Sequence, residues 1–95
     1  MSYLKKIVLH CSNGCPPNLE QLIKDFRAAG VIYVGVVGKD CSRIEDLIDE
    51  ICVCFGDDPY ELLTASHPDK SLEEAVEFAR ALTGEYAGEV QVMER

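Results

Sequence analysis

The sequence predicts a single α/β domain over residues 1–95, in which helices cover both faces of a parallel sheet. Short runs rich in β-branched residues alternate along the chain with longer segments whose apolar residues recur at helical spacing. The first short run is densely apolar, and the second shows no alternation of apolar and polar residues, which is typical of a strand buried on both faces. A barrel of eight strand–helix units needs about 250 residues, so a single open sheet is expected instead.

The first half of the chain contains two strand–helix units. Leu4 to Cys11 and Val31 to Val37 are the predicted strands, and Gly35 within the second is expected to let a helix pack closely. Each strand is followed by a possible capping box and an apolar stripe, with Gly30 and Gly56 as the expected helix ends. The first helix has the box Asn18 with Gln21 and the stripe Leu19, Leu22, Ile23 and Phe26. The second helix has the box Ser42 with Glu45 and the stripe Ile44, Leu47, Ile48, Ile51 and Phe55.

The second half adds two shorter strands around a third helix. Tyr60 to Ala65 and Glu89 to Met93 are the predicted strands, and alternation in the second places Val90 and Val92 on one face. The helix between them has the clearest capping box of the chain. The capping box is Ser71 with Glu74, and Gly84 is the expected helix end. The apolar stripe consists of Leu72, Ala75, Val76, Ala79 and Leu82.

The resulting order is βαβαβαβ, and the right-handed rule for crossovers leaves few topologies. We expect a three-layer α/β/α arrangement with a four-stranded parallel sheet in the order 2-1-3-4, a truncated flavodoxin-like or Rossmann-like layout. Ligands of such sheets bind beyond the carboxyl ends of the strands, where the strand order reverses. The reversal here falls between the first and third strands, so a crevice is expected between the loops at Cys11–Cys15 and His67–Asp69.

The residues expected at this edge suit several kinds of chemistry. The predicted ligand-binding residues are Ser12, Asn13, Gly14, Cys15, Lys39, Asp40, Cys41 and Asp69, and the candidates for a catalytic role are Cys11 and His67, with His10 beside them. Backbone N–H groups ahead of a helix are able to bind an anion. The cysteines are either zinc ligands together with His67 or small buried residues at strand ends. Because the chain has no C-x2-C pair, we predict no metal. No cofactor is predicted either.

The charge of the chain argues against two classes of partner. The 9 basic and 17 acidic residues give a net charge of −8, which repels nucleic-acid phosphates and anionic lipid heads. No nucleic acid and no membrane is therefore expected, and the absence of a signal peptide or membrane span predicts a cytoplasmic protein with reduced cysteines. The acidic residues Glu45, Asp46, Asp49 and Glu50 form either a solvated face or a surface for a partner protein.

The segment Thr64 to Ala75 resembles a family of small bacterial proteins of unknown function. It contains a Thr-x-x-His motif, Thr64 to His67, and a Ser-Leu-x-Glu-Ala helix start, Ser71 to Ala75; the likeness extends loosely to Gly38–Cys41. The family often has an aromatic residue where this chain has Ser66. The resemblance implies an α/β fold and no particular activity. Small acidic proteins of this kind also occur in mobile gene cassettes and as immunity-type partners of toxins.

A shorter resemblance covers Ile7 to Gly14, which is similar to the phosphocysteine loop of sugar phosphotransferase IIB subunits. In that family the cysteine that ends the first strand carries phosphate, held by a loop rich in Ser and Thr. Here the loop continues as Cys15-Pro16-Pro17-Asn18, and proline has no N–H to donate. Two functions therefore stay open. The first is a binding or protein-interaction module, with self-association as a dimer included, and the alternative is a cysteine-based enzyme or phosphocarrier that uses Cys11.

Overall fold

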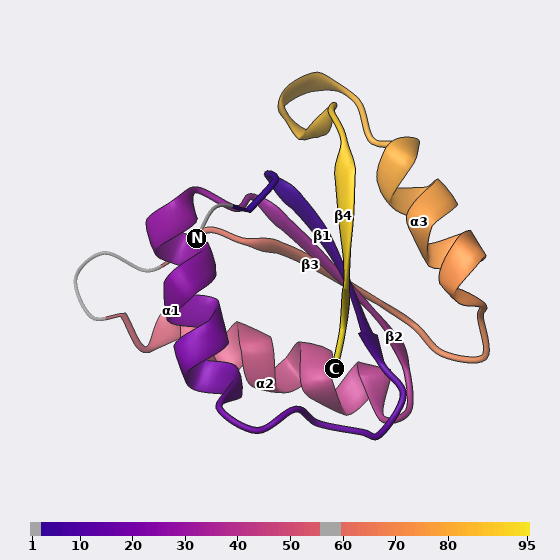
Figure 1. The fold of residues 1–95 in the computed structure, drawn as a ribbon. Coiled ribbons are helices and arrows are strands. Elements are labelled where there is room, and N and C mark those ends of the chain that lie inside the picture. Colours follow the sequence, from indigo (N-terminus) through magenta and orange to yellow (C-terminus); the bar gives the residue numbers. More distant parts are fainter. Residues whose placement is uncertain (1–2, 56–59) are drawn as a thin grey trace.

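Four parallel strands form one sheet in the computed structural model, which describes residues 3–55 and 60–95 (Figure 1). The strands are β1 (Lys6–Cys11), β2 (Tyr33–Gly38), β3 (Leu63–His67) and β4 (Val90–Glu94). β1 pairs with β2 and β4, and β3 pairs with β2, all in parallel, so the order is β3-β2-β1-β4. The predicted α/β class and parallel sheet are confirmed.

The expected strand order, 2-1-3-4, is wrong: β1 lies between β2 and β4 rather than between β2 and β3, and β3 is an edge strand beside β2. β1 and β2 carry almost continuous apolar runs that are buried on both faces. β3 has the sequence Leu-Thr-Ala-Ser-His and is partly exposed along its whole length. An inner strand of a parallel sheet has both faces covered and needs apolar residues on both, whereas an edge strand tolerates hydroxyls and imidazole. The burial requirement therefore places β3 at the edge.

The helices divide between the two faces of the sheet (Figure 1). They are α1 (Leu19–Ala29), α2 (Cys41–Val53) and α3 (Leu72–Arg80), followed by the short 3-10 helix η1 (Gly84–Tyr86). α1 and α2 pack on the face that includes Ile7 and Val34, and α3 packs on the face that includes Val8 and Val37. The described part of the chain has no helix with the length and apolar composition needed to cross a bilayer.

The helix stripes point into these two cores as predicted. All four α1 stripe residues are buried, as are Ile44 and Ile48 of α2 and Ala75 and Ala79 of α3. Lys6 is also fully buried, and its Nζ donates a 2.7 Å hydrogen bond to the Ala79 carbonyl in the last turn of α3. A cation is favourable there because the helix dipole makes this end of α3 partly negative.

One of the three expected capping boxes is present. The Ser71 hydroxyl accepts from the Glu74 N–H at 3.2 Å, and the Glu74 carboxylate accepts from the Ser71 N–H at 3.3 Å. The residues before α1 and α2 are Asn18 and Asp40, with φ of 60° and 58° and no side-chain capping bond. An N-cap that bonds through its side chain normally has extended backbone angles. The boxes expected at Asn18 and at Ser42 are therefore wrong.

The ends of the elements differ from the expected ones in several places. Gly30 ends α1 with a φ of 82°, as predicted. α2 and α3 end earlier than expected, and Gly84 starts η1 instead of closing α3; Gly56 lies outside the described residues. Tyr60, expected in the third strand, precedes it and donates its hydroxyl proton to the Val31 carbonyl.

Gly35 leaves room for an aromatic ring of its own strand. A Cβ atom at Gly35 would lie 2.5 Å from Tyr33 Oη and 3.1 Å from Tyr33 Cζ. Tyr33 is fully buried and lies two residues earlier on the same face of β2. The atoms nearest to a side chain at Gly35 are thus those of the Tyr33 ring, and the expectation that Gly35 admits a closely packed helix stays a prediction.

Candidate functional site

The loops after β1, β2 and β3 meet at the carboxyl edge of the sheet in the order of the strands. A Cβ atom on Gly14 would lie 3.4 Å from Asp40 Oδ2, so the loop after β1 contacts the loop after β2. A hollow of about 490 Å³ then lies between the loop after β2 and the Pro68–Asp69 turn after β3. The crevice expected between the Cys11–Cys15 and His67–Asp69 loops does not form, because β2 and its loop stand between them.

This hollow contains four of the predicted ligand-binding residues and charges of both signs. Its lining consists of Gly38, Lys39, Asp40, Cys41, Ser42, Arg43, Pro68 and Asp69. Lys39 and Arg43 are opposed by Asp40 and Asp69, so the lining has no net preference for an anion or a cation. Ser12, Asn13 and Cys15 are exposed in the loop on the other side of Asp40.

Three thiols gather under this edge, but two of them are in the core. Cys11 is 0% exposed and Cys41 is buried, whereas Cys15 is exposed. Burial raises the pKa of Cys11 to about 11, and the charges of Cys15 and Cys41 act in the same direction. The nucleophilic form of cysteine is the thiolate, so Cys11 is almost wholly in its unreactive form at neutral pH.

His67 lies on the opposite face of the sheet from Cys11. It pairs with Val37 on the α3 side, where its ring is 5.1 Å from that of Phe78, whereas Cys11 belongs to the core under α1 and α2. The Nε2 atom is buried without a hydrogen-bond partner, and desolvation lowers the pKa of the imidazole. Within residues 3–55 and 60–95, no group of three His, Cys, Asp or Glu side chains is arranged to hold a metal ion. The imidazole and the thiols therefore do not form one centre.

A histidine–carboxylate pair at the carboxyl ends of β1 and β4 was not expected from the sequence. His10 Nδ1 and Glu94 Oε1 are 2.8 Å apart, and the Arg95 N–H donates to the His10 carbonyl at 2.9 Å. The pairing of β1 with β4 brings them together across the whole length of the chain. A glutamate near the end of the last predicted strand was the available signal, but it is informative only once the strand order is known.

The outer side of β3 presents unpaired backbone groups. The Leu63 N–H donates to the Ile32 carbonyl at 3.1 Å, so the backbone of Leu63 faces β2. Backbone groups of successive strand residues point to opposite sides, so Thr64 and Ser66 direct theirs away from the sheet. β3 is the last strand on this side, and these groups are therefore available to another strand.

Two carboxylates of α2 converge on one hydroxyl beside this edge. Thr64 Oγ1 is 2.8 Å from Asp49 Oδ1 and 3.1 Å from Glu45 Oε2. A hydroxyl has a single proton, so Thr64 neutralises neither charge and donates to only one of them at a time. No Lys or Arg of the described residues forms an ion pair with either carboxylate. Like charges four residues apart also destabilise a helix slightly, which a cation between them would relieve.

An apolar hollow of about 400 Å³ lies beside the start of β3. Its lining consists of Asp49, Cys52, Val53, Tyr60, Glu61, Leu62, Leu63 and Tyr86. Val53 is 69% and Leu63 39% exposed, and the only charged residues of the lining are acidic. On the α3 side of the same strand, Phe78 is 48% exposed. The sequence signal for this surface was the polar composition of β3, which indicates an edge.

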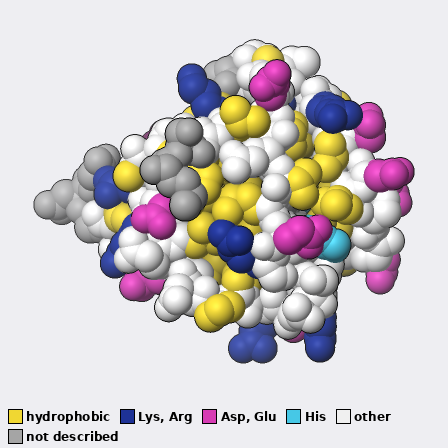
Figure 2. Space-filling model, viewed as in Figure 1, with side chains coloured by type: hydrophobic (Ala, Val, Ile, Leu, Met, Phe, Trp, Pro, Cys, Tyr) yellow, Lys and Arg dark blue, Asp and Glu magenta, His cyan; other side chains and the backbone are white. Residues whose placement is uncertain are grey.

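The opposite edge of the sheet has a different character. Figure 2 shows a band of hydrophobic side chains between α1 and α3, where β4 lies, with basic and acidic side chains both along its borders. Leu4, whose N–H donates to Gln91 of β4, and Val92 of β4 are exposed large hydrophobic residues here, 40% and 42% exposed. Because charges of both signs border the band, it has no preference for a partner of one sign.

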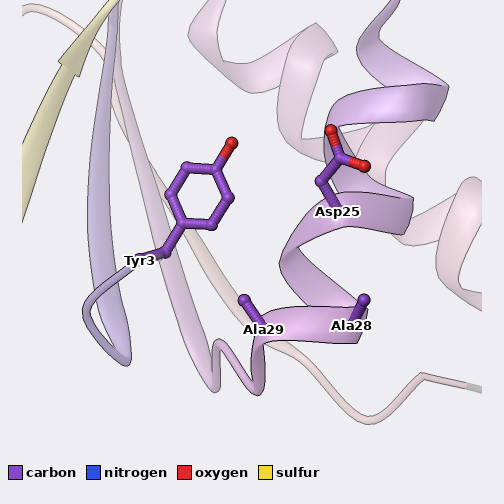
Figure 3. A pocket seen from close by; sticks show the side chains of 4 residues that line it. All are labelled: Tyr3, Asp25, Ala28 and Ala29. Carbon is purple, nitrogen blue, oxygen red and sulfur yellow. The ribbon is translucent and has the colours of Figure 1, made fainter. Parts of the chain in front are cut away.

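A shallow pocket of about 330 Å³ adjoins α1 and the N-terminal segment. Figure 3 shows the Tyr3 ring on one side and Asp25 with two alanines of α1 on the other. Tyr3 packs edge-on against Phe26, with ring centroids 5.1 Å apart. Asp25 is the only ionisable group besides the phenol of Tyr3 in this lining, so the pocket lacks the converging polar groups of a typical ligand site.

Comparison with known proteins agrees with one expectation from the sequence, that of a family of unknown function. No curated protein and no solved structure matches the chain. Neither the Thr-x-x-His motif nor the resemblance to phosphotransferase subunits receives support from these comparisons. The family model described as "Domain of unknown function (DUF7684)" matches residues 2–93, and the chain belongs to that family.

Proposed function

We propose that this protein is a protein-interaction module whose partner binds along the β3 side of the sheet. The observation that carries the proposal is the combination, on one edge, of outward backbone groups and exposed apolar side chains. Leu63 and Val53 border the apolar hollow, and the free backbone of Thr64 and Ser66 lies next to it. Exposed edges of this kind are the usual template for pairing with another chain.

The predicted ligand-binding residues at the carboxyl edge extend the same surface. Ser42 and Ser66 have their hydroxyl oxygens 3.5 Å apart, which connects β3 to the hollow that contains Lys39, Asp40 and Asp69. A partner that follows β3 toward its carboxyl end therefore reaches this hollow. The mixed charges there suit the polar rim of an interface rather than its apolar centre.

The geometry does not favour the alternative of a cysteine-based enzyme or phosphocarrier. Cys11 is fully buried with a pKa of about 11, and the candidate base, His67, lies on the other face of the sheet. A phosphocysteine needs an exposed thiolate surrounded by hydrogen-bond donors. Normal or slow alkylation of Cys11 by iodoacetamide at neutral pH is the expected result, and fast alkylation would restore the enzyme hypothesis.

Selection of displayed peptides tests the proposed surface even while the partner is unidentified. A random peptide library is selected on the wild-type protein, and enriched peptides are then measured on Leu63→Asp. Leu4→Asp is the matched control, since Leu4 and Leu63 are 40% and 39% exposed but lie at opposite edges of the sheet, beside β4 and in β3. We expect peptides that lose binding to Leu63→Asp and keep it with Leu4→Asp. Failure to enrich any peptide, or equal binding to both variants, contradicts the proposal.

A further inference from the structure

We infer that the partner segment is an extended, basic and apolar peptide that adds to β3 as a fifth strand of the sheet. This inference rests on the proposed function and specifies the chemistry of the partner. It follows from three properties of the β3 edge: its backbone, its charge and its apolar hollow. Each of them selects a different feature of the partner.

The backbone selects an extended conformation. Thr64 and Ser66 each offer an outward N–H and C=O, spaced by one residue whose backbone is used by β2. Only a second strand presents complementary groups at this alternating spacing. In contrast, a helix satisfies its own backbone groups internally and would leave those of β3 unpaired.

The charge selects Lys or Arg. The carboxylates of Glu45 and Asp49 share the single hydroxyl proton of Thr64, and Glu61 adds a third carboxylate to the hollow beside them. The basic residue near the far end of β3, Lys70, already pairs with Glu74 at 3.7 Å. A cationic side chain from an added strand would lie against the carboxylates and supply the donors that Thr64 lacks.

The apolar hollow selects a hydrophobic residue next to the cation. Cys52, Val53, Leu62 and Leu63 leave a space of about 400 Å³ that opens at the start of β3. Side chains of a strand alternate between its two faces, so the neighbours of a basic residue directed at Asp49 point to the α3 face. On that face they meet Leu63, which also lines the hollow, and Phe78, which are 39% and 48% exposed. Alternating basic and β-branched residues thus fit the edge.

A second copy of this chain fits the same edge poorly. Pairing two β3 strands would bring the carboxylates of one copy against those of the other, and each chain carries a net charge of −8. Like charges opposed across an interface weaken association. The charge therefore favours a basic partner over self-association.

The test uses a labelled peptide of about nine alternating lysine and valine residues, measured by fluorescence anisotropy at low salt. We expect it to bind at least about tenfold more tightly than the same peptide with glutamate in place of lysine. N-methylation of the peptide along one edge should weaken binding by about tenfold, since it removes backbone donors without changing charge. Asp49→Asn should weaken binding, while Glu89→Gln, beside the opposite edge, should not.

A backbone variant of the protein completes the test. Ser66→Pro removes an outward N–H that the sheet does not use, and Ser66→Ala controls for the lost hydroxyl. We expect Ser66→Pro to weaken the lysine peptide by about tenfold and Ser66→Ala to leave it unchanged. Equal binding of the lysine and glutamate peptides, or no effect of N-methylation, overturns the inference even if Ser66→Pro fails to fold.

The outcomes separate this inference from the proposed function. Library peptides that depend on Leu63 but are neither basic nor extended would overturn the fifth-strand inference and leave the interaction module standing. A concentration-dependent dimer in sedimentation experiments that competes with the lysine peptide would overturn the choice of a basic partner in favour of a second copy. If no peptide of either origin depends on Leu63, both the inference and the proposed function fail.

Discussion

Replacing Tyr33 with phenylalanine is expected to stabilise this protein. The Tyr33 side chain is fully buried, and its Oη has no hydrogen-bond partner. Burial raises its pKa from 10.0 to about 12, as expected for a phenol removed from water. A buried hydroxyl without a partner costs about 1–3 kcal/mol of stability, and phenylalanine keeps the ring that contacts Phe78.

The magnitude follows from two opposing effects. Removing the unpaired hydroxyl recovers about 1–3 kcal/mol, and the small void that remains costs roughly 1 kcal/mol. The net expected gain is about 1 kcal/mol, which raises the Tm by roughly 4–8 °C for a domain of this size. Urea unfolding followed by circular dichroism measures it as a higher midpoint with an unchanged slope.

Gly35 provides an internal check on this reasoning. Gly35→Ala would place a Cβ atom 2.5 Å from Tyr33 Oη and is expected to cost about 1–3 kcal/mol. In the Tyr33→Phe background the closest ring carbons are 3.1 and 3.2 Å away, so the same substitution should cost about 1 kcal/mol less. Tyr60→Phe is the matched control and should destabilise by about 1 kcal/mol, because the Tyr60 hydroxyl donates to the Val31 carbonyl. A loss of stability in Tyr33→Phe, or an equal cost of Gly35→Ala in both backgrounds, would refute the argument.

Three further predictions concern the helix cap and the thiols. Ser71→Ala should lower the free energy of unfolding by about 1 kcal/mol, because the Glu74 N–H loses its acceptor; an unchanged urea midpoint would contradict this role of the cap. Cys15 and Cys54 should react with Ellman's reagent in the folded protein, while the buried cysteines react only after unfolding; five fast thiols would be inconsistent with this structure. Burial raises the pKa of the Cys11 and Cys52 thiols from 9.0 to about 11, so the unfolded chain loses these protons first. The stability present below pH 9 should therefore decline as the pH rises toward 11, and urea midpoints that stay constant over this interval would refute it.

The helices were predictable because their apolar spacing depends only on local geometry. Leu22, Ile23 and Phe26 recur at helical spacing and are all buried in α1. The strand order was not predicted correctly, although a signal was present. Val31 to Val37 lacks polar residues, which indicates an inner strand, whereas Thr64 and Ser66 indicate an edge. Comparing the polarity of the strands, rather than following chain order, places β1 and β2 inside the sheet and β3 and β4 at its edges.

The candidate site depended on information that a sequence pattern does not contain. Cys11 aligns with Gly38 and His67 with Val37, one position earlier along the sheet. Because side chains alternate between faces, this single-residue difference puts the thiol and the imidazole on opposite sides. Register is set by loop lengths and packing, so the separation of these two residues is visible only in three dimensions. The contact of Thr64 with Glu45 and Asp49 depends on the same information, since it requires β3 to lie beside α2.

The acidic composition of the chain acquires a second physical role from the position of β3. Edge strands usually carry charges because charge prevents uncontrolled pairing between copies of the same protein. Here the charge beside the edge comes from α2, through Glu45 and Asp49, and leaves the backbone of β3 itself unobstructed. An edge protected in this way repels acidic chains, including other copies of itself, and still admits a basic strand. Protection against self-association and selection of a partner would then be the same electrostatic property, so neutralising Asp49 should weaken both together.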